Sequence, residues 1–180
     1  MIPSCSNTGE TITTEPPVIT VDPTTTPDIT SLPAYTEDLE FEFKLSFGAY
    51  GRSNINTFEN TITKDLVSAG NIKTEYIMPE ATRKEVYSML ERMDIMNFPS
   101  DLNFPLNNEH VDHLNLRVII EGEEKIVTWT VIWGFTFEGD MSSNITKQHL
   151  QFQELVEFIS TYVYESDEWK SLPDIEGGYM

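Results

Sequence analysis

The stretch that best predicts the fold is LEFEFKLSF, residues 39–47. Apolar and polar side chains alternate throughout it, with a leucine or phenylalanine at every odd-numbered position. Because successive side chains of a strand point to opposite faces, this period of two predicts a β-strand with one buried face and one face in water. Gly48 and Gly51 follow and interrupt the pattern.

Further strands are predicted on the C-terminal side of this stretch. Residues 59–67 are rich in β-branched Thr and Ile, and residues 72–78 show a similar composition. The turn residues Ser-Ala-Gly-Asn at 68–71 separate the two segments. We therefore predict a β-hairpin over residues 59–78.

A helix is predicted next, starting at Pro79 and Glu80. Proline is tolerated in a first helical turn, and a glutamate there complements the helix dipole. The helix carries an apolar stripe at helical spacing, formed by Val86, Met89, Leu90 and Met93. It should end before Phe98-Pro99, and residues 100–112 are polar and typical of a loop.

The second half of the chain repeats the combination of hairpin and helix. Residues 114–120 alternate between apolar and polar side chains, residues 121–124 supply a turn, and residues 126–133 run back as the second strand. The last helix follows, with Asn144 or Thr146 as its N-cap. Its broad apolar face comprises Phe152, Leu155, Val156, Ile159, Tyr162 and Val163.

The predicted order of elements is βββ-α-ββ-α. Two hairpins favour an antiparallel sheet of about five strands, and the two amphipathic helices are expected to pack on one face of it. This is an α+β fold and not a doubly wound nucleotide-binding fold. We place this single domain at residues 39–180.

Residues 1–38 are expected to be a disordered, acidic tether. Threonine and proline dominate this segment, no Lys or Arg precedes Lys44, and there is little apolar surface to offset the entropy of ordering. Cys5, the only cysteine, lies in Ile-Pro-Ser-Cys-Ser at 2–6, which has the residue order of a bacterial lipobox, although Pro3 fits it poorly. We expect lipidation at Cys5 and display on the extracellular face of a bacterial membrane. The alternatives are a secreted protein, or a disordered N-terminus with a stray cysteine.

The charge of the chain restricts its partners. The formal net charge is −19, from 30 acidic and 11 basic residues. Such a field repels nucleic acid and anionic membrane surfaces, so membrane association is expected only through a lipid on Cys5. It favours divalent cations and protein partners with a basic surface. We expect a monomer without a cofactor.

Two segments resemble a known group of proteins. They are residues 82–99, and the ending EWKSLP at 168–173 with GGY at 177–179. The group consists of uncharacterised small lipoproteins and secreted proteins of Gram-positive bacteria, in which an amphipathic helix runs into a Phe-Pro or Tyr-Pro stop and the last helix ends in a Leu-Pro tail. The resemblance covers residues 39–180 and rests on packing and terminating residues. It implies a cell-envelope location and no particular activity.

One loop carries candidate metal ligands. Glu109, His110, Asp112 and His113 place two imidazoles and two carboxylates within five residues, and these groups bind Zn²⁺ and similar ions. The spacing is not the helical H-E-x-x-H arrangement, and His149 could join only through the fold. The alternative is a polar loop that precedes a strand.

Other candidate sites have equally plain structural interpretations. Trp129 and Trp133 fall on one face of a predicted strand, where they form either core beneath the helices or an exposed platform for a ligand. The carboxylates of Glu138 and Asp140, and of residues 165–168, could hold Ca²⁺, but they lack the spacing of a calcium loop and favour a solvated cluster.

The functional hypotheses follow from what the sequence contains and lacks. It has no G-x-S-x-G elbow, no Walker or dinucleotide-binding loop, and no cysteine nucleophile inside the domain. We therefore favour a non-enzymatic binding domain tethered to the cell envelope. The alternatives are a metal-binding protein or metal-dependent hydrolase that uses residues 109–113, and an acidic inhibitor or immunity-type protein.

Overall fold

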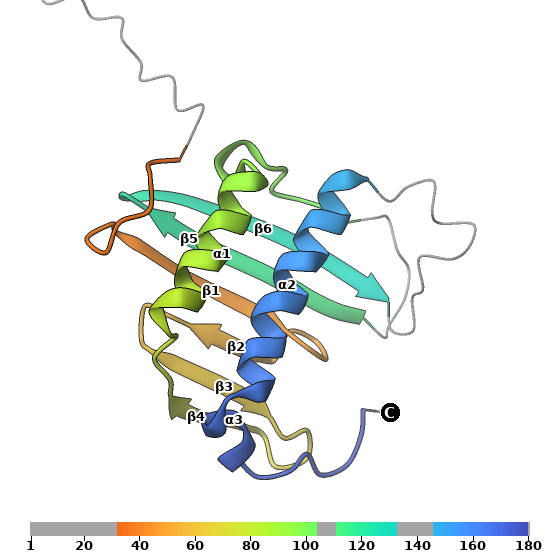
Figure 1. Ribbon diagram of the computed structural model, residues 1–180. Helices are drawn as coiled ribbons and strands as arrows, with labels where there is room; N and C mark the ends of the chain where they lie inside the picture. Colours follow the sequence, from red (N-terminus) through yellow and green to blue (C-terminus); the bar gives the residue numbers. More distant parts are fainter. Residues whose placement is uncertain (1–31, 104–110, 133–145, 180) are drawn as a thin grey trace, which may run out of the picture. The chain divides into compact units, whose positions relative to one another are not determined.

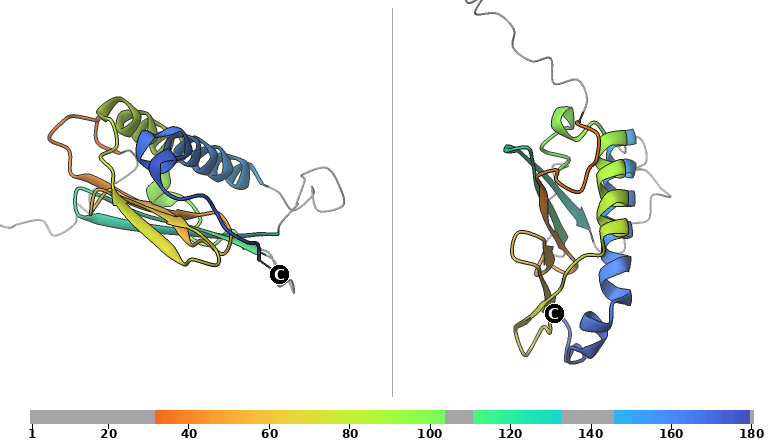
Figure 2. Two further views of the ribbon diagram at one scale, coloured as in Figure 1. Left: turned by 90° about the horizontal axis from the view of Figure 1, so that it is seen from below. Right: turned by 60° about the vertical axis from the view of Figure 1, so that its left-hand side comes forward.

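The protein folds around a six-stranded antiparallel sheet with the strand order β4-β3-β2-β1-β5-β6. The computed structural model describes residues 32–103, 111–132 and 146–179. The strands are β1 (Phe41–Phe47), β2 (Ser53–Asn56), β3 (Thr61–Asp65), β4 (Asn71–Glu75), β5 (Val111–Ile120) and β6 (Glu123–Ile132). Two long helices, α1 (Glu80–Arg92) and α2 (Lys147–Glu165), lie side by side on one face of the sheet (Figures 1 and 2). The predicted α+β class and the packing of both helices on one face are confirmed.

The sheet has one strand more than we expected. The additional strand is β2, which follows the interruption at Gly48 and Gly51. Both glycines have positive φ, and the N–H of Gly51 donates to the carbonyl of Gly48 at 2.9 Å, so the break is a tight turn that leads directly into β2. With only four residues, Ser-Asn-Ile-Asn, β2 is too short and too polar to show a clear alternation.

The strands of the second hairpin are longer than the sequence pattern predicts. β5 begins at Val111, three residues before the predicted start, and β6 begins at Glu123. Only Glu121 and Gly122 connect them, both with positive φ, as in a two-residue hairpin turn. The residues expected to form a polar loop before Leu114 are therefore drawn into the sheet by pairing with β6.

β1 lies in the middle of the sheet and supplies the centre of the core. Its alternating residues Phe41, Phe43, Leu45 and Phe47 are buried. Leu45 pairs with Ile55 of β2 on one side and with Leu116 of β5 on the other. Burial of each of these side chains contributes about 1.5–3 kcal/mol before entropy is subtracted. The stretch that best predicted the fold is thus the strand around which the sheet is assembled.

The N-terminus of α2 is held by an interaction with β6 and the preceding chain. Thr146, one of the two predicted N-caps, is the N-cap, and its N–H donates to Nδ1 of His149 at 3.1 Å. His149 is buried, and its Nε2 lies 3.0 Å from the carbonyl oxygen of Leu102. Its ring meets the Trp129 ring edge to face at 5.3 Å. This histidine has a structural role at the start of the helix.

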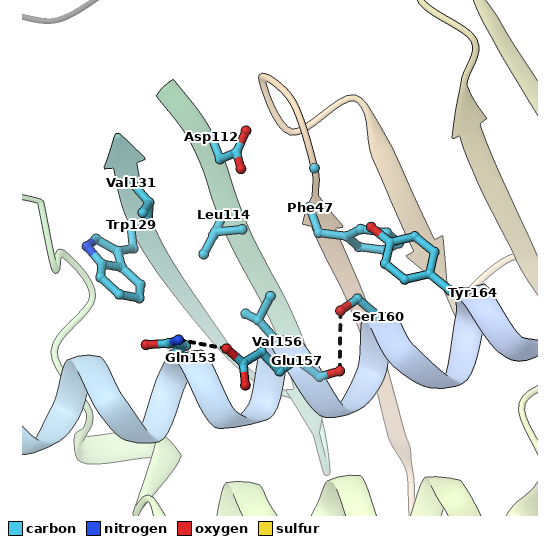
Figure 3. Close-up of a pocket in the computed structure, with 11 residues that line it drawn as sticks. Phe47, Asp112, Leu114, Trp129, Val131, Gln153, Val156, Glu157, Ser160 and Tyr164 are labelled. Carbon is cyan, nitrogen blue, oxygen red and sulfur yellow. Dashed lines mark hydrogen bonds between the residues drawn. The ribbon is translucent and has the colours of Figure 1, made fainter. Parts of the chain in front are cut away.

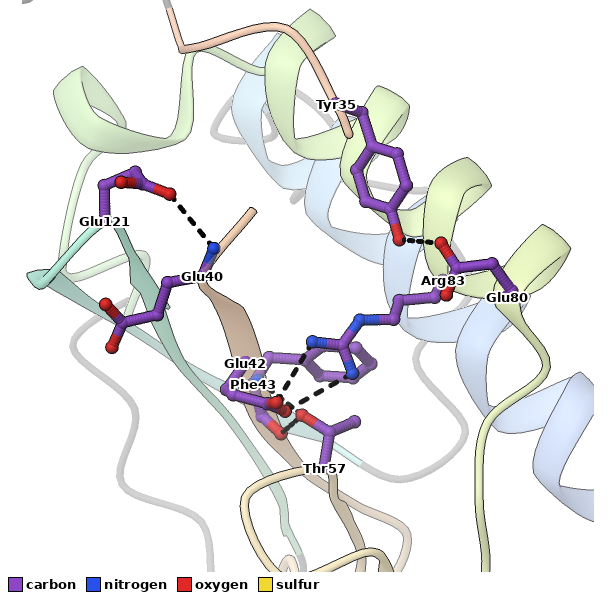
Figure 4. A network of polar contacts seen from close by, with 8 residues as sticks. All are labelled: Tyr35, Glu40, Glu42, Phe43, Thr57, Glu80, Arg83 and Glu121. Atoms are coloured by element: carbon purple, nitrogen blue, oxygen red, sulfur yellow. Dashed lines mark hydrogen bonds and ion pairs between the residues drawn. The ribbon is translucent and has the colours of Figure 1, made fainter. Parts of the chain in front are cut away.

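The packed chain begins N-terminal to Leu39, where we expected the domain to start. Leu32 and Tyr35 pack against the core, and the Tyr87 hydroxyl donates to the carbonyl of Pro33 at 2.7 Å. The Tyr35 hydroxyl donates to Glu80 at 2.6 Å, close to the Arg83–Glu42 ion pair (Figure 4). These contacts fasten the entry segment to α1. The remainder of the expected tether, with Cys5, lies outside the described residues.

The C-terminal segment returns to the sheet at β3 and the turn that follows it. A 3₁₀ turn, η1 (Ile95–Asn97), follows α1, and a short helix, α3 (Asp167–Ser171), follows α2. Trp169 of α3 packs on Phe47 and Tyr164, with ring centroids 6.2 and 5.2 Å away. The Tyr179 hydroxyl then donates to the Asp65 carboxylate of β3. Within the described ranges, neither long helix is apolar enough over its length to cross a membrane.

Candidate functional site

A pocket of ≈ 260 Å³ lies between α2 and the sheet, where β1 ends, β5 begins and β6 ends. Its floor and walls are apolar and comprise Phe47, Leu114, Trp129, Val131 and Val156. Its polar groups come from both layers and comprise Asp112, Gln153, Glu157, Ser160 and Tyr164 (Figure 3). An apolar cavity with a few polar groups is the usual form of a small binding site.

Strand alternation explains the sheet side of the pocket. Asp112 and Leu114 lie on the helix-covered face of β5, in register with Val131 and Trp129 of β6. The same face of β5 continues as Leu116 and further buried apolar residues. Asp112 is therefore a carboxylate at a position where the strand pattern otherwise places a core side chain.

Helical spacing explains the other side of the pocket. Gln153, Glu157, Ser160 and Tyr164 recur at intervals of four, three and four residues along α2, so they form one stripe beside its buried face. The Gln153 amide donates to the Glu157 carboxylate at 2.6 Å. The Ser160 hydroxyl donates to the carbonyl oxygen of Glu157 at 3.3 Å. These bonds orient the polar stripe toward the cavity (Figure 3).

Tyr164 forms the end of the pocket nearest β1. Its ring packs edge to face on Phe47 at 5.6 Å. One side of the ring remains exposed, whereas the hydroxyl points toward the sheet (Figure 3). Burial, and secondarily the negative charge of Asp112, raise the pKa of the Tyr164 hydroxyl above its usual range. The hydroxyl is therefore a neutral hydrogen-bonding group at physiological pH.

The charges that line the pocket are all negative. Asp112 and Glu157 contribute two carboxylates, and no Lys, Arg or His lies among the described residues that line it. An anionic ligand would be repelled by both carboxylates without a compensating positive charge among the described lining residues. A cation with an apolar stem, such as an alkyl ammonium or guanidinium group, matches both the carboxylates and the aromatic walls.

The two predicted metal ligands that lie among the described residues do not come together. Glu109 and His110 lie outside the described residues. Asp112 and His113 are consecutive in β5, so their side chains point to opposite faces of the sheet. Asp112 faces the pocket, whereas His113 is exposed on the other face, 3.3 Å from the Thr130 hydroxyl. Among the described residues, no three His, Cys, Asp or Glu side chains form a group that could hold a metal ion.

The two candidate tryptophans can be placed only in part. Trp129 is 2% exposed and packs against His149 and Phe152, which is the core position considered above. The edge of its side chain also lines the pocket (Figure 3). Trp133 lies outside the described residues, as do Glu138 and Asp140.

Sequence reasoning singled out two residues on the sheet side of the pocket and none of the polar residues on its helix side. Asp112 and Trp129 were both candidates, but for different sites. Glu157 and Tyr164 were not, because an exposed polar stripe beside an apolar helix face is typical of any amphipathic helix. The signal that would have selected them is the in-facing carboxylate of Asp112, which requires polar groups opposite it.

Comparison with known proteins adds no family or relative to this picture. No family model matches the chain, and no curated protein matches it.

Proposed function

We propose that this protein is a non-enzymatic binding domain of the cell envelope that takes a basic side chain of a protein partner into the pocket beneath α2. The observation that carries the proposal is the lining of that pocket, which combines Asp112 and Glu157 with aromatic walls and contains no basic residue among its described members. The net charge of −19 supports it, because a negative field accelerates the approach of a basic partner.

The chemistry of the pocket suits arginine best. A guanidinium group can donate two parallel hydrogen bonds to a carboxylate and stack on an aromatic ring, whereas an ammonium is a more strongly hydrated point charge. Leu114, Val131 and Val156 offer apolar contact to the aliphatic stem. A single side chain in a pocket of this size binds weakly, so the remaining affinity is expected from the surface around it.

The test uses two short peptides that differ in one charge. Ac-Gly-Arg-Gly-NH₂ and its citrulline analogue have nearly the same shape, but citrulline is neutral. We expect the arginine peptide to bind with a Kd on the order of 1 mM and the citrulline peptide at least roughly tenfold more weakly, measured from amide shifts in NMR titrations. The double variant Asp112→Asn/Glu157→Gln should abolish this discrimination.

A matched control separates the pocket from the general charge of the protein. Glu154 lies on α2 within one turn of Glu157, but it does not line the pocket. Glu154→Gln and Glu157→Gln remove the same charge from the same helix, so only the second should weaken binding of the arginine peptide. Equal weakening by both variants would mean that long-range charge alone attracts the peptide, and the proposed site would be wrong.

The same chemistry fits an acidic inhibitor or immunity-type protein that blocks a basic enzyme site. Such a protein would bind through the pocket and also suppress a turnover reaction of its partner. The proposed envelope location rests on the lipobox-like sequence around Cys5 in the expected tether. Labelling with palmitate tests it, because a lipid anchor requires label in the unchanged protein and its loss in Cys5→Ala.

A further inference from the structure

Two large apolar side chains are exposed on α2, one on either side of Glu157 of the pocket. Leu150 is 52% exposed and Tyr164 is 43% exposed. Each lies seven residues from Glu157, and seven residues are nearly two full helical turns. Each of the two side chains therefore projects from the helix within about 20° of the direction of Glu157. We call this line of residues, from Leu150 to Tyr164, the docking stripe.

The spacing along the helix sets the distance between these groups. An α-helix rises about 1.5 Å per residue, so Leu150 and Tyr164 each lie about 10 Å along the axis from Glu157. Between them, Gln153 and Ser160 line the pocket from the same helix (Figure 3). The docking stripe is thus apolar at both ends, and polar with a carboxylate at its centre.

The alignment with the pocket distinguishes these two side chains from ordinary surface residues. Single exposed apolar side chains are common on proteins and need no explanation. Tyr162 is one of them, because it is 42% exposed but lies about 140° around the helix from Glu157. Leu150 and Tyr164 instead flank the pocket at equal distances, so one ligand that enters the pocket can cover both.

The charge of α2 restricts what can lie along the docking stripe. After Lys147 the helix contains no Lys or Arg, whereas Glu154, Glu157 and Glu165 are acidic. Asp112 adds a carboxylate on the sheet side of the pocket. A segment with one basic side chain between two apolar ones complements both the charge and the apolar ends of the stripe.

The distance of about 10 Å selects the conformation of this segment. A polyproline II helix has three residues per turn and rises about 3.1 Å per residue, so side chains three positions apart share one side and lie about 9 Å apart. A β-strand places side chains three positions apart on opposite faces. A helical segment would require a continuous apolar seam, but Gln153 and Ser160 interrupt the docking stripe.

We propose that the docking stripe binds a polyproline II segment of a protein partner with the pattern apolar-x-x-Arg-x-x-apolar. The arginine enters the pocket beneath α2, and the apolar side chains three positions before and after it cover Leu150 and Tyr164. The register rests on the proposed function, because the arginine site fixes which residue of the segment lies opposite Glu157.

The test compares two peptides of identical composition by NMR titration of the full chain. Ac-Leu-Pro-Pro-Arg-Pro-Pro-Leu-NH₂ carries its leucines three positions from the arginine. Ac-Pro-Leu-Pro-Arg-Pro-Leu-Pro-NH₂ carries them two positions away, about 120° around a polyproline II helix from the arginine. We expect the first heptapeptide to bind roughly tenfold more tightly than the second and than Ac-Gly-Arg-Gly-NH₂. It alone should shift the amide of Leu150.

Variants separate the docking stripe from the pocket. Leu150→Ser removes one apolar contact and no residue that lines the pocket, so it should weaken the first heptapeptide roughly threefold and leave Ac-Gly-Arg-Gly-NH₂ unchanged. Tyr162→Ser removes a similarly exposed side chain from the same helix and should change neither affinity. Equal weakening of the first heptapeptide by both variants would overturn the docking stripe.

Two outcomes distinguish a wrong docking stripe from a wrong arginine site. If Ac-Gly-Arg-Gly-NH₂ binds in the pocket but the two heptapeptides bind equally, the arginine site stands and the docking stripe is wrong. If replacement of arginine by citrulline leaves the affinity of the first heptapeptide unchanged, the arginine site is wrong, and the register proposed for the segment is overturned with it.

Discussion

Gly51 lies where the turn between β1 and β2 passes closest to β5. Its φ is +65°, and a Cβ added to it would lie 2.4 Å from the carbonyl oxygen of His113. His113 follows Asp112, which lines the pocket together with Gly48 of this turn, so the turn lies at the mouth of the pocket. We predict that Gly51→Ala is severely destabilising, and that the cost comes mainly from this contact.

Gly70 provides the control from which the magnitude is obtained. Its φ is +81°, but a Cβ added there meets nothing within 4 Å. Gly70→Ala should therefore cost only the left-handed backbone conformation, about 1–2 kcal/mol. Gly51→Ala adds a backbone clash that cannot relax by rotation of a side chain, and overpacking of this kind costs about 1–3 kcal/mol more.

Urea denaturation followed by tryptophan fluorescence measures the two costs. Trp129 of β6 and Trp169 of α3 are both buried, so their emission reports unfolding of the core. We expect the free energy of unfolding to fall about 2–5 kcal/mol in Gly51→Ala and at most about 2 kcal/mol in Gly70→Ala. Equal losses in the two variants would refute the close approach of the turn to β5.

Two other predictions test the packing around the core. Burial and, to a smaller extent, Glu91 raise the pKa of Tyr87 to about 12, so the folded protein holds this proton more tightly than the unfolded chain does. The stabilisation that this raised pKa gives the folded state is complete below about pH 10 and disappears as the pH rises from about 10 to 12. In an alkaline denaturation series, the free energy of unfolding should therefore fall less in Tyr87→Phe than in the unchanged protein. Trp169 joins α3 to Phe47 and Tyr164, so Trp169→Ala should lower the free energy of unfolding by about 3–5 kcal/mol and change the pocket wall, whereas Tyr162→Ala on the exposed side of α2 should cost much less. Equal costs for the last two variants, measured by urea denaturation, would contradict the packing of α3.

The parts of the fold that sequence reasoning predicted are those with long hydrophobic periods. The alternation over residues 39–47 became β1, Phe41–Phe47, and the predicted apolar face of the last helix became the buried face of α2. Tyr162 is the exception, because its side chain is 42% exposed on the other side of the helix. In these segments local pattern and tertiary packing select the same structure, because the apolar face has only one place to be buried.

The parts that sequence reasoning missed depend on contacts between distant residues. β2 has only four residues, and it is a strand because β1 and β3 pair with it on both sides. The extension of β5 to Val111 likewise comes from its pairing with β6. Such pairing leaves little trace in local composition, since tertiary context overrides propensity in short strands.

The pocket shows the same limit. The acidic residue Asp112 and the helical residues Glu157 and Tyr164 are more than forty positions apart, and only the packing of α2 over β5 brings them to one cavity. Asp112 and His113, which were predicted to share a metal site, lie on opposite faces of the sheet because a strand, unlike a loop, sends consecutive side chains to opposite faces.

The most direct test of the central claim is a crystal structure of the protein with Ac-Gly-Arg-Gly-NH₂ bound. We predict a guanidinium group beneath α2, with N–H groups about 2.7–2.9 Å from the carboxylate oxygens of Asp112 or Glu157. Its aliphatic stem should lie against Val156 and the aromatic wall. A structure in which the peptide binds elsewhere, while the cavity beneath α2 holds only water, would contradict the account.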